Sequence, residues 1–154
     1  MTNLCCKVLD CLKGQTLVSA ESCTGGGIGA ALTAISGSSE VYKGGIISYT
    51  NWVKQHVLGV DSELLVREGA VSAPVAEEMA KGARDILHAD IAVSVTGLAG
   101  PGGDDYGNSV GTVYIGYADG NVKTHRKFQF SGDREAIRIQ AITESLNLIL
   151  AYNK

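Results

Sequence analysis

The stretch "SAESCTGGGIGAAL" (residues 19–32) decides the fold of this chain. The apolar run over residues 16–20 predicts a strand, and apolar residues with helical spacing after the glycines predict a helix over residues 26–35. Ser22 therefore lies where a strand passes directly into a glycine-rich helix start. From the residues alone, Ser22 can be a cap, part of an anion-binding turn or a nucleophile.

The rest of the chain continues this alternation of strands and helices. Apolar runs predict further strands over residues 44–50, 91–97, 110–118 and 123–130, of which the last two form a hairpin. Helical spacing predicts helices over residues 4–12, 51–58 (capped by Asn51), 62–68, 73–88 (capped by Ser72) and from Asp133 to about residue 152. This order predicts one domain over residues 1–154, a three-layer α/β/α sandwich with a mixed, mostly parallel sheet and a late β-hairpin.

Composition narrows the class of protein. The chain has 154 residues, 45% of them apolar, and a formal net charge of -3, which argues against a nucleic-acid-binding surface. The apolar runs are too short to span a bilayer, and the N-terminus does not resemble a signal peptide, so we expect no membrane partner and a cytoplasmic protein. The four cysteines form no CxxC pair and have no histidine at ligand spacing, so we expect no metal and no cofactor.

A lysine is the candidate base for a serine nucleophile. The three histidines lie among charged or surface positions, whereas Lys54 lies between Val53 and the apolar pair Val57 and Leu58. Partial burial there would lower the pKa of the lysine and allow it to accept a proton. An ordinary exposed lysine is the alternative.

Further residues and glycine-rich stretches could contact a ligand. Arg138 continues the apolar stripe of the last helix, so it either has a structural role or binds an anion; Arg134 is one turn earlier. The repeated glycines in the stretch "GLAGPGG" (residues 97–103) allow the backbone to approach a ligand closely. The "GGGIGA" stretch has the appearance of a dinucleotide-binding fingerprint, but no acidic residue ends the second strand as that fingerprint requires.

Six ordered motifs together resemble one family. The motifs "AESCTGG" (20–26), "SYTNWVK" (48–54), "GAVSAPV" (69–75), "TGLAGPGG" (96–103), "VGTVYIG" (110–116) and "FSGDREAIR" (130–138) are similar to the C-terminal domain of the CinA competence/damage-inducible family. The resemblance covers nearly the whole chain from about residue 16. Stand-alone members of this family include nicotinamide-nucleotide amidases.

The resemblance implies an activity and a set of site residues. It implies metal-free hydrolysis of the carboxamide of nicotinamide mononucleotide to nicotinate mononucleotide and ammonia, with a homodimer or larger homo-oligomer as the expected assembly. The family's nucleophile falls on Ser22, its lysine on Lys54 and its assisting tyrosine on Tyr49. The positions expected to bind substrate or its oxyanion are Thr24, Gly25, Gly26, Asn51, Thr96, Gly97, Gly100 and Arg138, with Arg138 as the candidate ligand of the phosphate.

Two departures from the family pattern leave other functions open. Trp52 and Val53 occupy positions that are commonly polar in the family, and the segment over residues 104–109 looks shorter and more acidic. The alternatives are a nucleotide-binding module without turnover and a protein-interaction module linked to competence or DNA damage. The family's other domain, which resembles molybdopterin-binding proteins, is outside this sequence, so its activities are not assigned.

Overall fold

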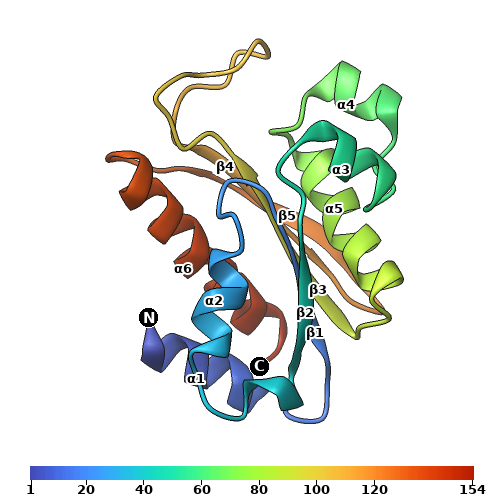
Figure 1. Cartoon of the computed structure of the whole chain (residues 1–154), viewed down its shortest axis with the longest axis vertical. Helices are drawn as coiled ribbons and strands as arrows, with labels where there is room; N and C mark the ends of the chain where they lie inside the picture. Colours follow the sequence, from blue (N-terminus) through green and yellow to red (C-terminus); the bar gives the residue numbers. More distant parts are fainter.

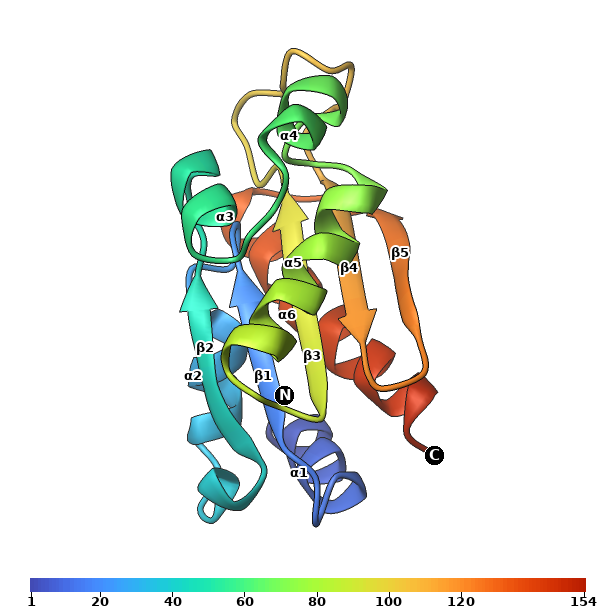
Figure 2. The same ribbon diagram turned by 90° about the vertical axis from the view of Figure 1, so that its right-hand side faces the viewer.

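A five-stranded mixed sheet forms the centre of the computed structural model, which describes residues 1–154. The strand order is β2-β1-β3-β4-β5 (Figure 2). The β1 strand pairs in parallel with β2 and β3, while β4 is antiparallel to both β3 and β5. The strands are β1 (Leu17–Glu21), β2 (Tyr42–Ile47), β3 (Ile91–Gly97), β4 (Thr112–Ala118) and β5 (Lys123–Gln129).

Helices cover both faces of this sheet (Figure 1). On one face lie α1 (Thr2–Cys11), α2 (Gly27–Thr33) and α6 (Arg134–Tyr152). On the other lie α3 (Asn51–His56), α4 (Ser62–Glu68) and α5 (Ala73–Ile86). The three-layer α/β/α sandwich and the late hairpin are therefore confirmed.

The core is divided by the sheet into two apolar clusters. Every residue of β1 is buried, as is all of β3 except its last residue, as expected for central strands covered on both faces. The larger cluster joins the sheet to α1, α2 and α6, and the smaller one joins it to α5 and the segment after α3. These two clusters fix the ends of β1 and β3 relative to the helices on either face of the sheet.

Some element boundaries differ from the prediction. The second strand is Tyr42–Ile47 because the chain leaves the sheet at Ser48. Thr50, not Asn51, caps α3, since its side chain accepts from the Val53 N–H. Ser72 occupies the N-cap position of α5, but its hydroxyl donates to the Gly69 carbonyl instead of capping the helix.

The predicted cap of the last helix is correct. Asp133 accepts a hydrogen bond from the Ala136 N–H at 2.9 Å, so α6 starts with Arg134. A short 3-10 turn, η1 (Ser38–Glu40), was not predicted. None of the helices is both long and apolar enough to cross a membrane.

Candidate active site

A cavity of about 310 Å³ lies where β1 and β3 end and α3 begins. The turn after β1, the start of α3, the segment before α5, the loop after β3 and the start of α6 all contribute to its wall. In Figure 2 these segments gather beyond the arrowheads of β1, β2 and β3. The lining residues are Ser22, Cys23, Tyr49, Asn51, Lys54, Ala70, Val71, Thr96, Gly97, Leu98, Ala99, Gly100, Gly102 and Arg134.

A serine and a lysine that are 32 positions apart in the sequence meet in this cavity. The Lys54 Nζ donates to the Ser22 Oγ at 2.9 Å and to the Ser48 carbonyl at 2.8 Å. The backbone fixes the positions of both residues. The Ser22 N–H donates to the Val95 carbonyl near the end of β3, and Lys54 lies in α3, which Thr50 caps. A nucleophile and a base at hydrogen-bond distance are the arrangement that nucleophilic catalysis needs.

Burial prepares Lys54 to act as that base. Its residue surface is only 2% exposed, and no carboxylate forms an ion pair with it. Because burial penalises the charged ammonium, the pKa of Lys54 falls from 10.5 to about 8. About one-tenth of the molecules then carry a neutral amine at pH 7, compared with less than about one in a thousand for a free lysine.

The turn after Ser22 leaves backbone donors without partners. Gly25 and Gly26 have φ values of 59° and 101°, a left-handed conformation that explains the glycines. The N–H groups of Cys23, Thr24 and Gly26 donate to no other residue, and Cys23 lines the cavity beside Ser22. Unpaired N–H groups next to a nucleophile can stabilise a developing oxyanion.

The neighbouring thiol is a poor nucleophile. Cys23 is buried, and burial raises the pKa of its thiol to about 11. The thiol therefore stays protonated at neutral pH, whereas thiolate is the reactive form of cysteine. Of the two side chains, the geometry favours Ser22 because only its Oγ contacts the lysine.

The two arginines of α6 differ from the expectation. Arg138 does not line the cavity; its guanidinium donates to the carbonyls of Cys23 and Thr24, both at 3.0 Å, and so holds the turn from behind. Arg134 lines the cavity instead. Its Nη1 donates to the Gly100 carbonyl at 2.6 Å and its Nη2 to the Tyr49 hydroxyl at 3.2 Å. From the sequence, Arg138 alone is expected at the site, and Arg134 is noted only as lying one turn before it.

The remaining expected site residues fall into two groups. Tyr49, Asn51, Thr96, Gly97 and Gly100 line the cavity with Ser22 and Lys54. Thr24, Gly25 and Gly26 do not line it. The Thr24 side chain is fully buried and donates to the carboxylate of Glu21 at 2.7 Å, so it is not free to contact a ligand.

Two aromatic residues also lie differently from expectation. Tyr49 contacts Arg134 rather than Ser22 or Lys54, so the lysine reaches the serine without a tyrosine between them. Trp52 does not line the cavity. It is 63% exposed and stacks on His56 with ring centroids 4.3 Å apart. The departure from the family pattern at Trp52 therefore lies outside the cavity wall.

The acidic loop that departs from the family pattern is ordered by its own hydrogen bonds, although residues 105–107 at its tip are exposed. Asp104 accepts hydrogen bonds from the N–H groups of Tyr106 and Asn108, both at 3.0 Å. Burial alone would raise the pKa of Asp104, but hydrogen bonds outweigh it and the pKa lies below its ordinary value. Tyr106 then donates to the Val66 carbonyl at 2.7 Å, which ties the loop to α4.

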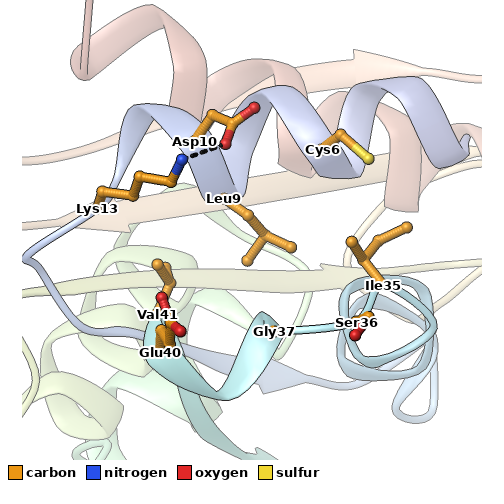
Figure 3. A pocket seen from close by; sticks show the side chains of 9 residues that line it. All are labelled: Cys6, Leu9, Asp10, Lys13, Ile35, Ser36, Gly37, Glu40 and Val41. Atoms are coloured by element: carbon orange, nitrogen blue, oxygen red, sulfur yellow. Dashed lines mark ion pairs between the residues drawn. The ribbon is translucent and has the colours of Figure 1, made fainter.

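A second cavity of about 310 Å³ lies between α1 and the segment after α2, at the other end of the sheet (Figure 3). Leu9, Ile35 and Val41 line it together with the exposed ion pair of Asp10 and Lys13. It contains no serine and base in contact, so the first cavity is the candidate active site.

Comparisons with known proteins identify the family of the chain. A family model described as the CinA C-terminal domain matches residues 3–152. A CinA-like protein of Synechococcus sp. (strain RCC307) is 52% identical over 139 residues, which cover 89% of this chain and 33% of that protein. The chain spans about a third of the length of the first curated relatives that it matches.

A shorter relative and a solved structure match over most of their own length. The nicotinamide-nucleotide amidohydrolase PncC of Enterobacter agglomerans is 49% identical over 140 residues, 90% of this chain and 85% of that protein. The crystal structure of a CinA superfamily protein from Enterobacter cloacae has a TM-score of 0.96 at 34% identity, covering 99% of this chain and 92% of the other. The chain belongs to the CinA C-terminal domain family.

Proposed function

We propose that this chain is an amidohydrolase that converts nicotinamide mononucleotide to nicotinate mononucleotide and ammonia. The observation that carries the proposal is the 2.9 Å hydrogen bond between buried Lys54 and Ser22. The similarity to a protein named nicotinamide-nucleotide amidohydrolase supports the choice of substrate. The geometry alone supports hydrolysis of an amide or ester, because both proceed through a serine-bound acyl group.

In the first step, Ser22 becomes acylated. Its Oγ attacks the carboxamide carbon while neutral Lys54 takes the hydroxyl proton. The oxyanion accepts a hydrogen bond from the N–H group of Cys23, which lines the cavity and donates to no other residue. The C–N bond then breaks, and the Lys54 ammonium gives its proton to the leaving nitrogen, so that ammonia departs.

In the second step, water releases the product. Lys54, neutral again after protonating ammonia, takes a proton from a water molecule that attacks the acyl carbon. The ester bond to the Ser22 Oγ breaks, and Lys54 returns the proton to the serine. The carbonyl of Ser48 accepts a hydrogen bond from the Lys54 Nζ throughout and keeps the amine pointed at the serine.

Arg134 is the proposed ligand of the substrate phosphate. It is exposed at the wall of the cavity and has no carboxylate partner. A guanidinium binds phosphate well because its planar donors match the phosphate oxygens. Arg138, whose donors are engaged by two backbone carbonyls, keeps the turn in place instead.

Incubation of the purified chain with nicotinamide mononucleotide tests the proposal. Ammonia and nicotinate mononucleotide should appear in equal amounts, and neither should appear with a Lys54→Arg variant that binds the substrate. Binding without turnover by the wild-type chain would instead indicate a nucleotide-binding module. Absence of both binding and turnover would contradict the proposal altogether.

A further inference from the structure

A buried carboxylate lies directly behind the serine. Glu21 is the last residue of β1 and is 2% exposed. Its Oε1 accepts from the Thr24 hydroxyl at 2.7 Å and from the Ile28 N–H at 2.8 Å. Its Oε2 accepts from the Ser19 hydroxyl at 3.0 Å and from the Gly29 N–H at 3.1 Å. Four donors therefore surround one carboxylate that has no cationic partner.

These contacts replace the ordinary cap of a helix. Gly26, at the N-cap of α2, offers no side chain, so the N–H groups of the first turn need another acceptor. Glu21 supplies it from the strand, seven and eight positions upstream of Ile28 and Gly29. Glu21 therefore links the end of β1, just before the turn at residues 22–26, to the helix that follows this turn.

The network extends to the edge of the sheet. The Ser19 hydroxyl also contacts the Tyr42 hydroxyl at 2.7 Å. A Cβ at Gly29 would lie 2.7 Å from that Tyr42 oxygen, and a Cβ at Gly45 would lie 2.5 Å from the Ser19 Oγ. Two glycines thus provide the space in which this polar network is packed.

Stability alone is a weak reason for such a network. Burying a charge costs free energy that its hydrogen bonds only offset, and apolar replacements of buried charges are often neutral or stabilising. The turn held by Glu21 carries the Ser22 Oγ and the unpaired N–H groups of Cys23 and Thr24. A misplacement of such groups by about 1 Å can reduce turnover about 100-fold.

We infer that Glu21 is a positioning residue, which holds the turn at residues 22–26 so that Ser22 stays against Lys54 and the adjacent Cys23 N–H faces the reacting carbonyl. The inference rests on the proposed role of Ser22 as nucleophile. It assigns no contact between Glu21 and the substrate, because Glu21 does not line the cavity. The carboxylate acts through the turn.

The test measures how fast Ser22 reacts, separately from turnover of the nucleotide. A Glu21→Gln variant keeps the shape of the side chain but places an amide NH₂ against a backbone N–H. We expect labelling of Ser22 by a fluorophosphonate, followed by mass spectrometry, to slow at least about tenfold. The kcat for nicotinamide mononucleotide should fall by a similar factor, while KM changes by less than about threefold because the cavity wall is intact.

Asp90→Asn is the matched control. Asp90 accepts hydrogen bonds from the N–H and hydroxyl of Thr16, just before the opposite end of β1. Its loss should lower the melting temperature without changing the rate of Ser22 labelling. If Glu21→Gln also lowers only the melting temperature and labels at the wild-type rate, Glu21 is a structural residue and the inference is wrong.

A milder variant covers the case in which Glu21→Gln does not fold. Ser19→Ala removes one of the four donors and should slow labelling in a folded protein. Labelling of this variant at the wild-type rate would then overturn the inference.

The labelling assay also separates this inference from the proposed substrate. If wild-type Ser22 is labelled but no ammonia is released from the nucleotide, the proposed substrate is wrong, while the labelling rates still decide the role of Glu21. An unreactive Ser22 in the wild-type chain would overturn both.

Discussion

At the scale of single residues, the proposed chemistry depends on a lysine that is shielded from water. Lys54 is buried against Ser22 and the Ser48 carbonyl, with no carboxylate to stabilise its charge. The same burial that disfavours the ammonium also excludes competing solvent from the serine. Packing therefore favours both the proposed role of Lys54 as base and that of Ser22 as nucleophile.

The rate should therefore follow the protonation of Lys54. The pKa of about 8 predicts that kcat/KM rises between pH 6 and 9 and levels off above the pKa, since the neutral amine is the active form. Lys54→Arg should be at least about 1,000-fold slower, because the guanidinium keeps its proton. A wild-type pH profile in the Lys54→Arg variant would mean that another group is the base.

The proposed role of Arg134 gives a prediction about substrate affinity. Arg134→Ala should raise KM for nicotinamide mononucleotide by about 10-fold to 100-fold and change kcat little, since it removes binding that the ground state and transition state share. The substrate without phosphate, nicotinamide riboside, should be turned over equally by the wild-type and Arg134→Ala chains. Equal loss of affinity for both substrates would show that Arg134 does not bind the phosphate.

At the scale of elements, α5 is held against the chain that leaves α3. Gly82 faces the Leu58 backbone so closely that a Cβ would collide with the Leu58 carbonyl. This contact places the helix that carries Lys54 over the sheet, and Leu58 packs in the same apolar cluster as Met79 and Ala83. The position of Lys54 thus depends on a glycine in a neighbouring helix.

Substitution at Gly82 should destabilise the protein despite favouring the helix. Alanine gains about 1 kcal/mol of intrinsic helix stability over glycine. The backbone clash should outweigh this, so Gly82→Ala should lower the free energy of unfolding by about 1–3 kcal/mol in urea titrations. Lys81→Ala, on the exposed side of the same helix, should change it by less than about 0.5 kcal/mol. A more stable Gly82→Ala protein would contradict this account of the packing.

Most elements could be predicted from the sequence because they depend on local spacing, whereas the roles expected for Ser22 and Lys54 came from the resemblance to the family. The identity of the cavity arginine could not be predicted. Arg134 and Arg138 are one helical turn apart, and which one faces the cavity depends on where the Gly100 loop meets α6. The role of Glu21 was equally hidden, since two of the four groups that donate hydrogen bonds to it belong to a helix that begins six positions later.

At the scale of the whole molecule, the direction of the strands assembles the site. The β1, β2 and β3 strands end at the same edge, so Ser22, Ser48 and the loop after Gly97 converge there. The late hairpin adds β4 and β5 and returns the chain to α6, which brings Arg134 to the same cavity. Such crevices at the carboxyl ends of strands are the usual binding sites of α/β sheets.

The proposed mechanism uses only side chains and backbone of this one chain, so chelators should not affect it. Turnover after dialysis against EDTA should equal that of the untreated protein, within the error of the ammonia assay. Loss of turnover in EDTA, with recovery on addition of a divalent metal, would show that a metal takes part in a step assigned here to Lys54 or to the turn at residues 22–26.

The most direct measurement compares ammonia release by Ser22→Ala and Cys23→Ala with that of the wild-type chain. Ser22→Ala should fold normally and lose turnover by at least about 1,000-fold, because no nucleophile remains. Cys23→Ala should stay within about tenfold of wild type, since its protonated thiol takes no part and the backbone N–H persists. A folded Ser22→Ala protein that releases ammonia at a rate near that of the wild type would contradict the central claim.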